Sequence, residues 1–333
     1  MSTAQPNDAP LRGTIRTVGL IGGGVIGSGW AARALAHGLD VVAYDPAPAG
    51  AAALRVAVDN AWPALERRGL AVGADPARLR IAASVAEVAA TADFIQENAP
   101  EREDLKRGLL AEIDAAAPAT VVIASSSSGL LPSRIQADCG HPGRVVIGHP
   151  FNPVYLLPLV EIVPGDRTAA AAVDTAAAFY RSIGMRPLRV RKEVEGYLSD
   201  RLQEALWREA LHLVAEGIAS TEELDDAIVY GPGLRYAFMG TCLTFHLAGG
   251  EGGMAHMLDQ FGPALKLPWT KLIAPELTRE LRDRMVEGTA AQADGWTVKA
   301  LERWRDDCLI RLLEVLEPLR RDRIQAPATV PAP

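Results

Sequence analysis

The chain has 333 residues, of which 49% are hydrophobic and 23% are charged. This composition is typical of soluble globular proteins, and the length suits two domains. The formal net charge of −7 disfavours nucleic acid and anionic membranes as partners. No apolar run is long enough to cross a bilayer, so no membrane segment is expected either.

The chain ends and the three cysteines indicate the compartment. Residues 1–13 lack the charged and apolar regions of a secretory signal, so we expect a short disordered tail there and another at 323–333. Cys139, Cys242 and Cys308 lie far apart and show no metal-ligand spacing. We expect small buried side chains in a reducing compartment, hence a cytoplasmic protein without disulfides or a metal.

A glycine-rich turn follows the apolar run from Val18 to Ile21 and leads into a helical pattern that lasts until Gly38. The spacing is G-x-G-x-x-G, in which the first glycine allows the turn, the second leaves the backbone bare for pyrophosphate, and the third allows close helix packing. Free amides at the helix start would bind the pyrophosphate. The predicted cofactor-binding residues here are Gly22, Gly24, Val25, Ile26 and Gly27.

A second apolar run, Val41 to Tyr44, ends at Asp45, about twenty residues beyond the glycines. A carboxylate at this place accepts hydrogen bonds from the adenosine ribose and repels a 2′-phosphate. The next three residues, Pro46 to Pro48, include no arginine that would hold such a phosphate. The sequence therefore predicts a dinucleotide site with Asp45 at the ribose, and it favours NAD over NADP.

Strand and helix patterns alternate through the first part of the chain. Such alternation predicts an α/β fold with a Rossmann-type doubly wound, mostly parallel sheet covered on both faces. From about residue 194 onward only helical patterns recur, so the second domain is expected to be all helix. We predict an NAD-binding domain over 14–193 and a helical substrate and dimerisation domain over 194–322. Expected strands are 18–21, 41–44, 80–83, 93–97, 120–124, 144–148, 159–163 and 186–190, and expected helices of the second domain include 202–217, 240–248, 252–261, 275–287 and 297–319.

Polar residues gather where strands end, which is where doubly wound sheets bind ligands. Ser125 to Gly129 follow one buried strand, and His149 ends the next. A structural and a catalytic role are both open for a lone histidine at such a place. Glu161 lies within the apolar run Leu159 to Val163 and needs a buried partner, for which His149 is the natural choice.

The glycine motif, Asp45, the pair Glu101 and Lys106, the serine run, His149-Pro-Phe-Asn-Pro153 and Leu159-Val-Glu161 together resemble the 3-hydroxyacyl-CoA dehydrogenase superfamily. The resemblance covers nearly the whole chain. It implies Glu101 and Lys106 as further cofactor-binding residues. It also implies three catalytic residues around the reacting hydroxyl, with His149 as general base, Glu161 orienting its ring, and Ser128 donating to the substrate oxygen.

Within the superfamily, the stretches 22–46, 148–163 and 238–272 resemble the L-carnitine 3-dehydrogenase branch. This resemblance implies NAD-dependent oxidation of the 3-hydroxyl of L-carnitine to 3-dehydrocarnitine, and a homodimer. Two departures separate the chain from the acyl-CoA enzymes: their Ser-Asn-Thr-Ser-Ser is Ser125-Ser-Ser-Ser-Gly129 here, and their asparagine before Arg-Leu is Asp200. Three alternatives remain: an L-gulonate 3-dehydrogenase, a 3-hydroxyacyl-CoA dehydrogenase, and a crystallin-like protein that binds NAD without turnover.

A quaternary ammonium makes no ordinary hydrogen bond, so aromatic faces or a carboxylate must recognise it. Phe245 is our first choice as the aromatic residue, and Asp200 would add charge attraction unless it pairs with a neighbouring arginine. Ser128, Asp200 and Phe245 are thus the predicted substrate-binding residues. Each aromatic candidate has a packing role as its alternative; the candidates are Tyr197, Tyr236, Phe238, Phe245 and Trp269.

Overall fold

The computed structural model describes residues 15–237, 240–261, 263, 267–271, 276, 278–281, 283–284 and 295–325. The chain divides into two compact units, 1–200 and 201–333. The predicted boundary after residue 193 stays a prediction. The expected tail 1–13 lies outside the described residues, as does 326–333, whereas 323–325 belong to a helix.

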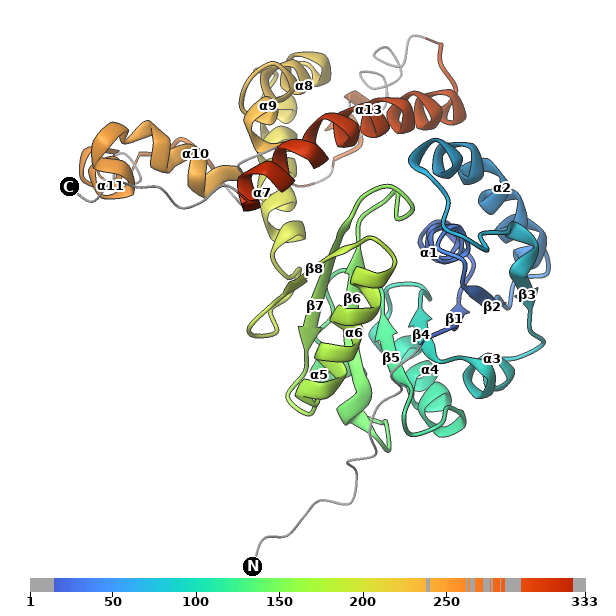
Figure 1. The fold of residues 1–333 in the computed structure, drawn as a ribbon. Coiled ribbons are helices and arrows are strands. Elements are labelled where there is room, and N and C mark those ends of the chain that lie inside the picture. Colours follow the sequence, from blue (N-terminus) through green and yellow to red (C-terminus); the bar gives the residue numbers. More distant parts are fainter. Residues whose placement is uncertain are drawn as a thin grey trace, which may run out of the picture. The chain divides into compact units, whose positions relative to one another are not determined.

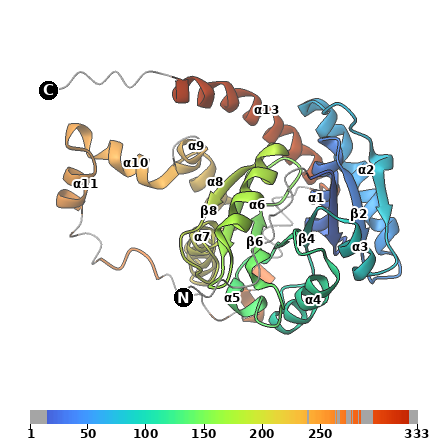
Figure 2. The same ribbon diagram turned by 60° about the horizontal axis from the view of Figure 1, so that its bottom comes forward.

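The first unit is built on one eight-stranded sheet (Figures 1 and 2). Its strand order is β3-β2-β1-β4-β5-β6-β7-β8, and neighbouring strands are parallel except β6 and β7. The predicted Rossmann-type, mostly parallel sheet is therefore confirmed. The strands are β1 (Thr17–Ile21), β2 (Asp40–Tyr44), β3 (Leu79–Ile81), β4 (Phe94–Glu97), β5 (Val122–Ser125), β6 (Val145–Pro150), β7 (Leu159–Pro164) and β8 (Arg186–Arg189).

Helices bury both faces of this sheet, because alternate residues of each strand point to opposite sides. Val122 and Ala124 of β5 belong to a core with α1, α2 and α6, whereas Ile123 belongs to a second core with α3, α4 and α5. Each core is lined almost entirely by aliphatic and aromatic side chains. The helices are α1 (Val25–Ala36), α2 (Gly50–Arg68), α3 (Val85–Thr91), α4 (Glu103–Ala116), α5 (Pro132–Ile135) and α6 (Ala170–Ser182).

The carboxyl ends of the parallel strands meet at one edge of the sheet. β1 lies between β2 and β4, and this is the switch point where doubly wound sheets bind ligands. The turn after β6 reverses the chain, so β7 returns antiparallel to it, with His149 directly opposite Glu161 in the register. The reversal brings Glu161 of β7 next to His149, near the end of β6.

The described part of the second unit contains helices and no strand, as predicted. A complete capping box begins α8, since Ser220 Oγ accepts from the Glu223 amide while the Glu223 carboxylate accepts from the Ser220 amide. None of the described helices is long and apolar enough to cross a membrane. The helices are α7 (Ser199–Ala215), α8 (Thr221–Val229), α9 (Pro232–Tyr236), α10 (Gly240–Ala248), α11 (Gly253–Phe261) and α13 (Val298–Gln325).

The cysteine prediction was right for one residue and wrong for two. All three are free thiols, but only Cys139 is buried, whereas Cys242 and Cys308 are exposed. Burial is the main cause that raises the pKa of the Cys139 thiol to about 12. The two exposed cysteines lie in α10 and α13.

Candidate active site

The glycine turn after β1 has the geometry that a bound pyrophosphate requires. Gly22 has a φ of +92°, which disfavours any other residue, and a side chain there would meet the Asn98 carbonyl. A Cβ at Gly27 would lie 1.9 Å from the Gly22 carbonyl oxygen, whereas a Cβ at Gly24 would meet nothing within 4 Å. Open space over Gly24 at the start of α1 fits a phosphate group bound by backbone amides.

Asp45 lies directly after β2 and holds the same turn in place. One carboxylate oxygen accepts from the Gly23 amide at 2.7 Å, and the other accepts from the Ala47 amide at 2.8 Å. Each oxygen retains capacity for another hydrogen bond. The geometry is compatible with a ribose contact, and it adds a structural task that the sequence alone did not indicate.

The structure brings His149 and Glu161 together across the antiparallel β6–β7 pair. Nδ1 of His149 lies 3.1 Å from Glu161 Oε2, and both residues are buried. Since a carboxylate only accepts hydrogen bonds, the contact favours the tautomer of the neutral imidazole that has its hydrogen on Nδ1 and its lone pair on Nε2. Nε2 is then an acceptor at the carboxyl edge of the sheet.

Glu161 stays ionised because the protein surrounds it with donors. Its other oxygen accepts from the backbone amides of Leu198 and Ser199, at 3.1 and 3.0 Å. Burial alone would raise the pKa of the Glu161 carboxyl, but the hydrogen bond from His149 and those from the two amides outweigh it, and the pKa lies below its usual value.

Three further side chains surround the His149 ring. Asp200 Oδ2 lies 3.7 Å from Nε2, close enough for charge attraction but beyond hydrogen-bond length. The Phe151 and Tyr197 rings meet the imidazole edge-on, with centroids 4.8 and 5.6 Å away. Tyr197 is buried and donates its hydroxyl to the Leu130 carbonyl at 2.7 Å, so its ring is held in place. Phe151 was not singled out from the sequence, although it lies two residues after His149.

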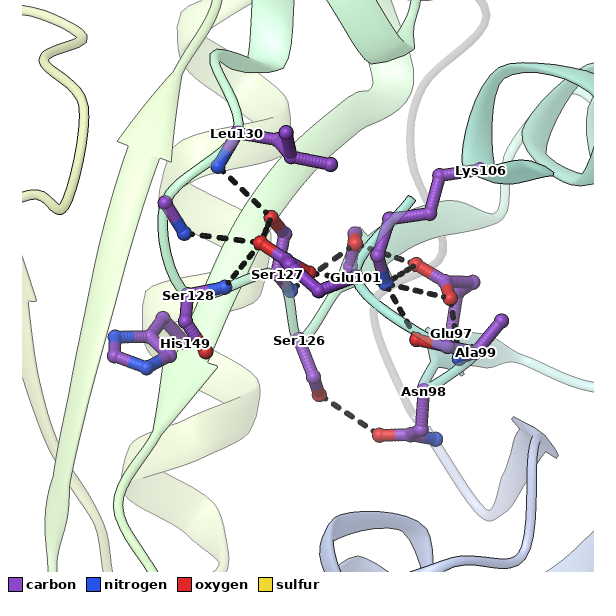
Figure 3. A network of polar contacts seen from close by, with 12 residues as sticks. Glu97, Asn98, Ala99, Glu101, Lys106, Ser126, Ser127, Ser128, Leu130 and His149 are labelled. Atoms are coloured by element: carbon purple, nitrogen blue, oxygen red, sulfur yellow. Dashed lines mark hydrogen bonds and ion pairs between the residues drawn. The ribbon is translucent and has the colours of Figure 1, made fainter. Parts of the chain in front are cut away.

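The serine loop after β5 is held by Glu101 (Figure 3). A single Glu101 oxygen accepts from the Ser127 hydroxyl and from the amides of Ser128 and Gly129, the latter two at 3.0 and 3.1 Å. β5 and β6 are neighbours in the sheet, which places Ser128 and His149 at the same edge. Figure 3 shows both residues there, Ser128 on the loop and His149 at its strand end.

Lys106 is an internal partner of the segment that follows β4 rather than an exposed cation. Its ammonium donates to both oxygens of Glu97, at 2.9 and 3.0 Å, and to the Ala99 carbonyl at 2.9 Å (Figure 3). Those contacts use all three of its hydrogens. Lys106 and Glu97 are 1% and 0% exposed, so Lys106 supports the loop that carries Glu101. Direct contact of Glu101 and Lys106 with the cofactor stays a prediction.

The aromatic candidates for substrate binding in the second unit are exposed or lie outside the described residues. Phe245 lies in α10 and is exposed, Tyr236 and Trp269 are exposed as well, and Phe238 lies outside the described residues. Their roles in substrate binding stay predictions. Among the described residues, no cluster of His, Cys, Asp and Glu has the arrangement of a metal site.

A doubly wound sheet with this glycine turn and a buried histidine–carboxylate pair is typical of NAD-dependent dehydrogenases. The 3-hydroxyacyl-CoA dehydrogenase NAD binding domain matches residues 17–194, and the C-terminal domain of the same enzymes matches 196–287. The chain belongs to the 3-hydroxyacyl-CoA dehydrogenase family. It is an NAD-dependent oxidoreductase, as predicted.

The curated relatives that share more than half of their residues with this chain include L-carnitine dehydrogenases. The L-carnitine dehydrogenase of Pseudomonas aeruginosa is 64% identical over 299 residues, covering 90% of this chain and 93% of that enzyme. The L-carnitine dehydrogenase of Burkholderia mallei is 59% identical over 306 residues, covering 92% and 95%. Among solved structures, the NAD+-dependent dismutase 5-formyl-3-hydroxy-2-methylpyridine 4-carboxylic acid 5-dehydrogenase superposes with a TM-score of 0.76 at 29% identity, covering 91% of this chain and 99% of that one.

Proposed function

We propose that the protein oxidises the 3-hydroxyl of L-carnitine to 3-dehydrocarnitine with NAD. The observation that carries this proposal is the pair formed by His149 and Glu161 at the carboxyl edge of an NAD-binding sheet, with a second carboxylate, Asp200, on the far side of the imidazole. The identity of this chain to L-carnitine dehydrogenases over nine-tenths of its length supports the same choice.

The chemistry needs a base at the hydroxyl. An alcohol releases hydride readily only as its O–H proton leaves, and Nε2 of His149 has the lone pair that accepts this proton. Glu161 stabilises the imidazolium that results and keeps the ring in the required tautomer. Ser128 donates a hydrogen bond to the substrate oxygen. When bound, NAD supplies the hydride acceptor, while the protein supplies position and field.

Asp200 explains why the substrate would carry a positive charge. In carnitine, a single carbon separates the carbinol from the trimethylammonium group. A hydroxyl bound at Nε2 therefore brings that cation close to Asp200, whose carboxylate lies 3.7 Å from the same nitrogen. Attraction between opposite charges at the edge of a protein is worth a few kcal/mol at most. Phe245 remains the proposed aromatic partner of the ammonium group, worth about 0.5 to 2 kcal/mol.

The test measures the rate of NADH formation, by absorbance, with a panel of alcohols as substrates. Wild-type protein is expected to oxidise L-carnitine faster than L-gulonate, 3-hydroxybutyryl-CoA or 3-hydroxybutyrate, which lacks the ammonium group. Asp200→Asn should raise the Michaelis constant for carnitine and leave that for 3-hydroxybutyrate nearly unchanged, since only one of them carries the cation. Equal turnover of carnitine and 3-hydroxybutyrate by the wild type would exclude cation recognition, and NAD binding without turnover of any of them would favour the crystallin-like alternative.

We also propose that the protein works in the cytoplasm as a homodimer. Exposed thiols such as Cys242 and Cys308 persist in a reducing compartment. Large apolar side chains are exposed on several helices of the second unit, and exposed apolar surface of this kind favours association. They include Leu206, Trp207, Leu247, Trp304, Leu312 and Val315.

A further inference from the structure

A buried glutamine links the two segments that carry Ser128 and His149. Gln96 lies in β4 and is 1% exposed. Its amide nitrogen donates one hydrogen to the Ser126 hydroxyl at 2.7 Å and the other to the Gly148 carbonyl at 3.0 Å. Gly148 directly precedes His149, and Ser126 lies two residues before Ser128. One rigid amide group therefore sets the spacing between the serine loop and the end of β6.

The orientation of this amide is fixed from the other side. Tyr180 of α6 donates its hydroxyl to Gln96 Oε1 at 2.7 Å. A flipped amide would turn Oε1 toward the Gly148 carbonyl, so that two acceptors would face each other. Tyr180 reaches this place because Gly148 has no side chain: a Cβ there would lie 1.8 Å from the Tyr180 hydroxyl. The alternative amide orientation is therefore strongly disfavoured.

The same network extends to the dinucleotide turn. Ser126 accepts a second hydrogen bond from the Trp30 indole of α1 at 3.0 Å and donates to Asn98 at 2.8 Å, the contact drawn in Figure 3. The backbone amide of Asn98 in turn donates to the carbonyl of Ile21, the last residue before the glycine turn, at 2.7 Å. All hydrogens of Gln96 and Ser126 side chains are used, which makes the network rigid.

We propose that Gln96 is a positioning residue that fixes the His149 imidazole relative to the Ser128 hydroxyl. The proposal rests on the roles given above to those two residues. Base and donor must reach the same substrate oxygen together, and a displacement of about 1 Å lowers turnover by up to about a hundredfold. No contact of Gln96 with substrate or cofactor is part of the proposal.

The test replaces Gln96 by methionine, which has a similar length and no amide. Gln96→Met is expected to lower kcat by about tenfold to a hundredfold, with the Kd for NAD and the Michaelis constant for the alcohol within about twofold of wild type. The matched control is Gln136→Met, because Gln136 is equally buried and its side-chain nitrogen has no hydrogen-bond partner among the residues that the structure describes. The control should keep wild-type kcat. A wild-type kcat in folded Gln96→Met would overturn the proposal.

A second measurement separates positioning from general loosening of the fold. In a His149→Ala background, Gln96→Met should cause little further loss of kcat, because the group that it positions is gone. Equal losses in both backgrounds would overturn the proposal. If Gln96→Met does not fold, Tyr180→Phe replaces it in the test. This variant keeps the buried ring but removes the hydrogen bond to Gln96 Oε1, so kcat should fall severalfold. An unchanged kcat would overturn the proposal.

The measurements use whichever alcohol of the panel the wild type oxidises fastest. Failure of carnitine as substrate would thus overturn the proposed function without touching the role of Gln96. Conversely, if the wild type is active and Gln96→Met has the same kcat, only the positioning role is overturned.

Discussion

At the scale of single residues, Asp45 holds the glycine turn and is predicted to bind the ribose, and one substitution can separate these two roles. An asparagine keeps an oxygen for the Gly23 amide, which Asp45 now binds at 2.7 Å, but it carries no charge. We expect Asp45→Asn to weaken the binding of NAD about tenfold, the scale of a hydrogen bond to a charged group. The preference of the protein for NAD over NADP should become smaller. Dissociation constants of both cofactors measure this. Asp40→Asn, at the start of the same strand, is the control, and an unchanged preference for NAD would place Asp45 away from the ribose.

Glu161 makes a prediction about pH. Its pKa is lower in the folded protein than the usual carboxyl value, because donors from His149 and two amides outweigh burial. A lowered folded pKa stabilises the fold at pH values above the unfolded pKa, about 4.3, and the stabilisation is lost as pH falls through the folded pKa. Wild type should therefore lose more stability on acidification than Glu161→Gln, as read from urea midpoints across pH. Exposed Glu195→Gln should follow wild type, and parallel curves for Glu161→Gln would refute the assignment.

At the scale of elements, two substitutions in the turn between β1 and α1 should distinguish effects on stability from effects on NAD affinity. Gly24→Ala adds a methyl to open space, so stability should change by no more than about 0.5 kcal/mol. NAD affinity should fall, since the methyl would occupy the place predicted for the pyrophosphate. Gly27→Ala adds a methyl 1.9 Å from the Gly22 carbonyl, so stability should fall by about 1 to 3 kcal/mol. Thermal unfolding and NAD titration of both variants test this. Equal loss of stability in the two would contradict the assigned roles.

The order of strands and helices was largely predictable, and the direction of one strand was not. Buried runs such as Val122 to Ala124 are apolar on both faces, and turn residues mark their ends. β7 is also a continuous apolar run except for Glu161, so its pattern is the same whether it is parallel or antiparallel to β6. Only the three-dimensional structure shows the reversal, and the reversal is what makes Glu161 the neighbour of His149.

The site was predictable where chemistry is local in sequence. The glycine turn, the serine run and His149 all lie at strand ends, which is a recurrent position for ligands. The supporting network was not predictable, because Gln96 and Tyr180 are 84 residues apart and each taken alone is an ordinary strand or helix residue. The same holds for Lys106: the family resemblance implied a cofactor contact, and its internal contacts with Glu97 and Ala99 appear only in the structure.

At the scale of the whole molecule, the helical unit predicts an assembly. Trp304 of α13 is 56% exposed, and burying large apolar side chains contributes about 1.5 to 3 kcal/mol each. We expect a dimer in sedimentation equilibrium, and Trp304→Glu should shift it toward monomer. Val72→Glu is the control, since Val72 is also apolar and fully exposed but lies in the first unit. A wild type that sediments as a monomer would contradict the dimer.

The central claim is that His149 is the base of an NAD-linked alcohol oxidation, and the most direct measurement is turnover of L-carnitine by His149→Ala. We predict a loss of about a hundredfold or more in kcat, the usual scale for losing acid–base catalysis, with NAD affinity unchanged. Glu161→Gln should cause a related loss, and the double variant should be little worse than His149→Ala alone. A His149→Ala variant that turns over carnitine at the wild-type rate would contradict the claim.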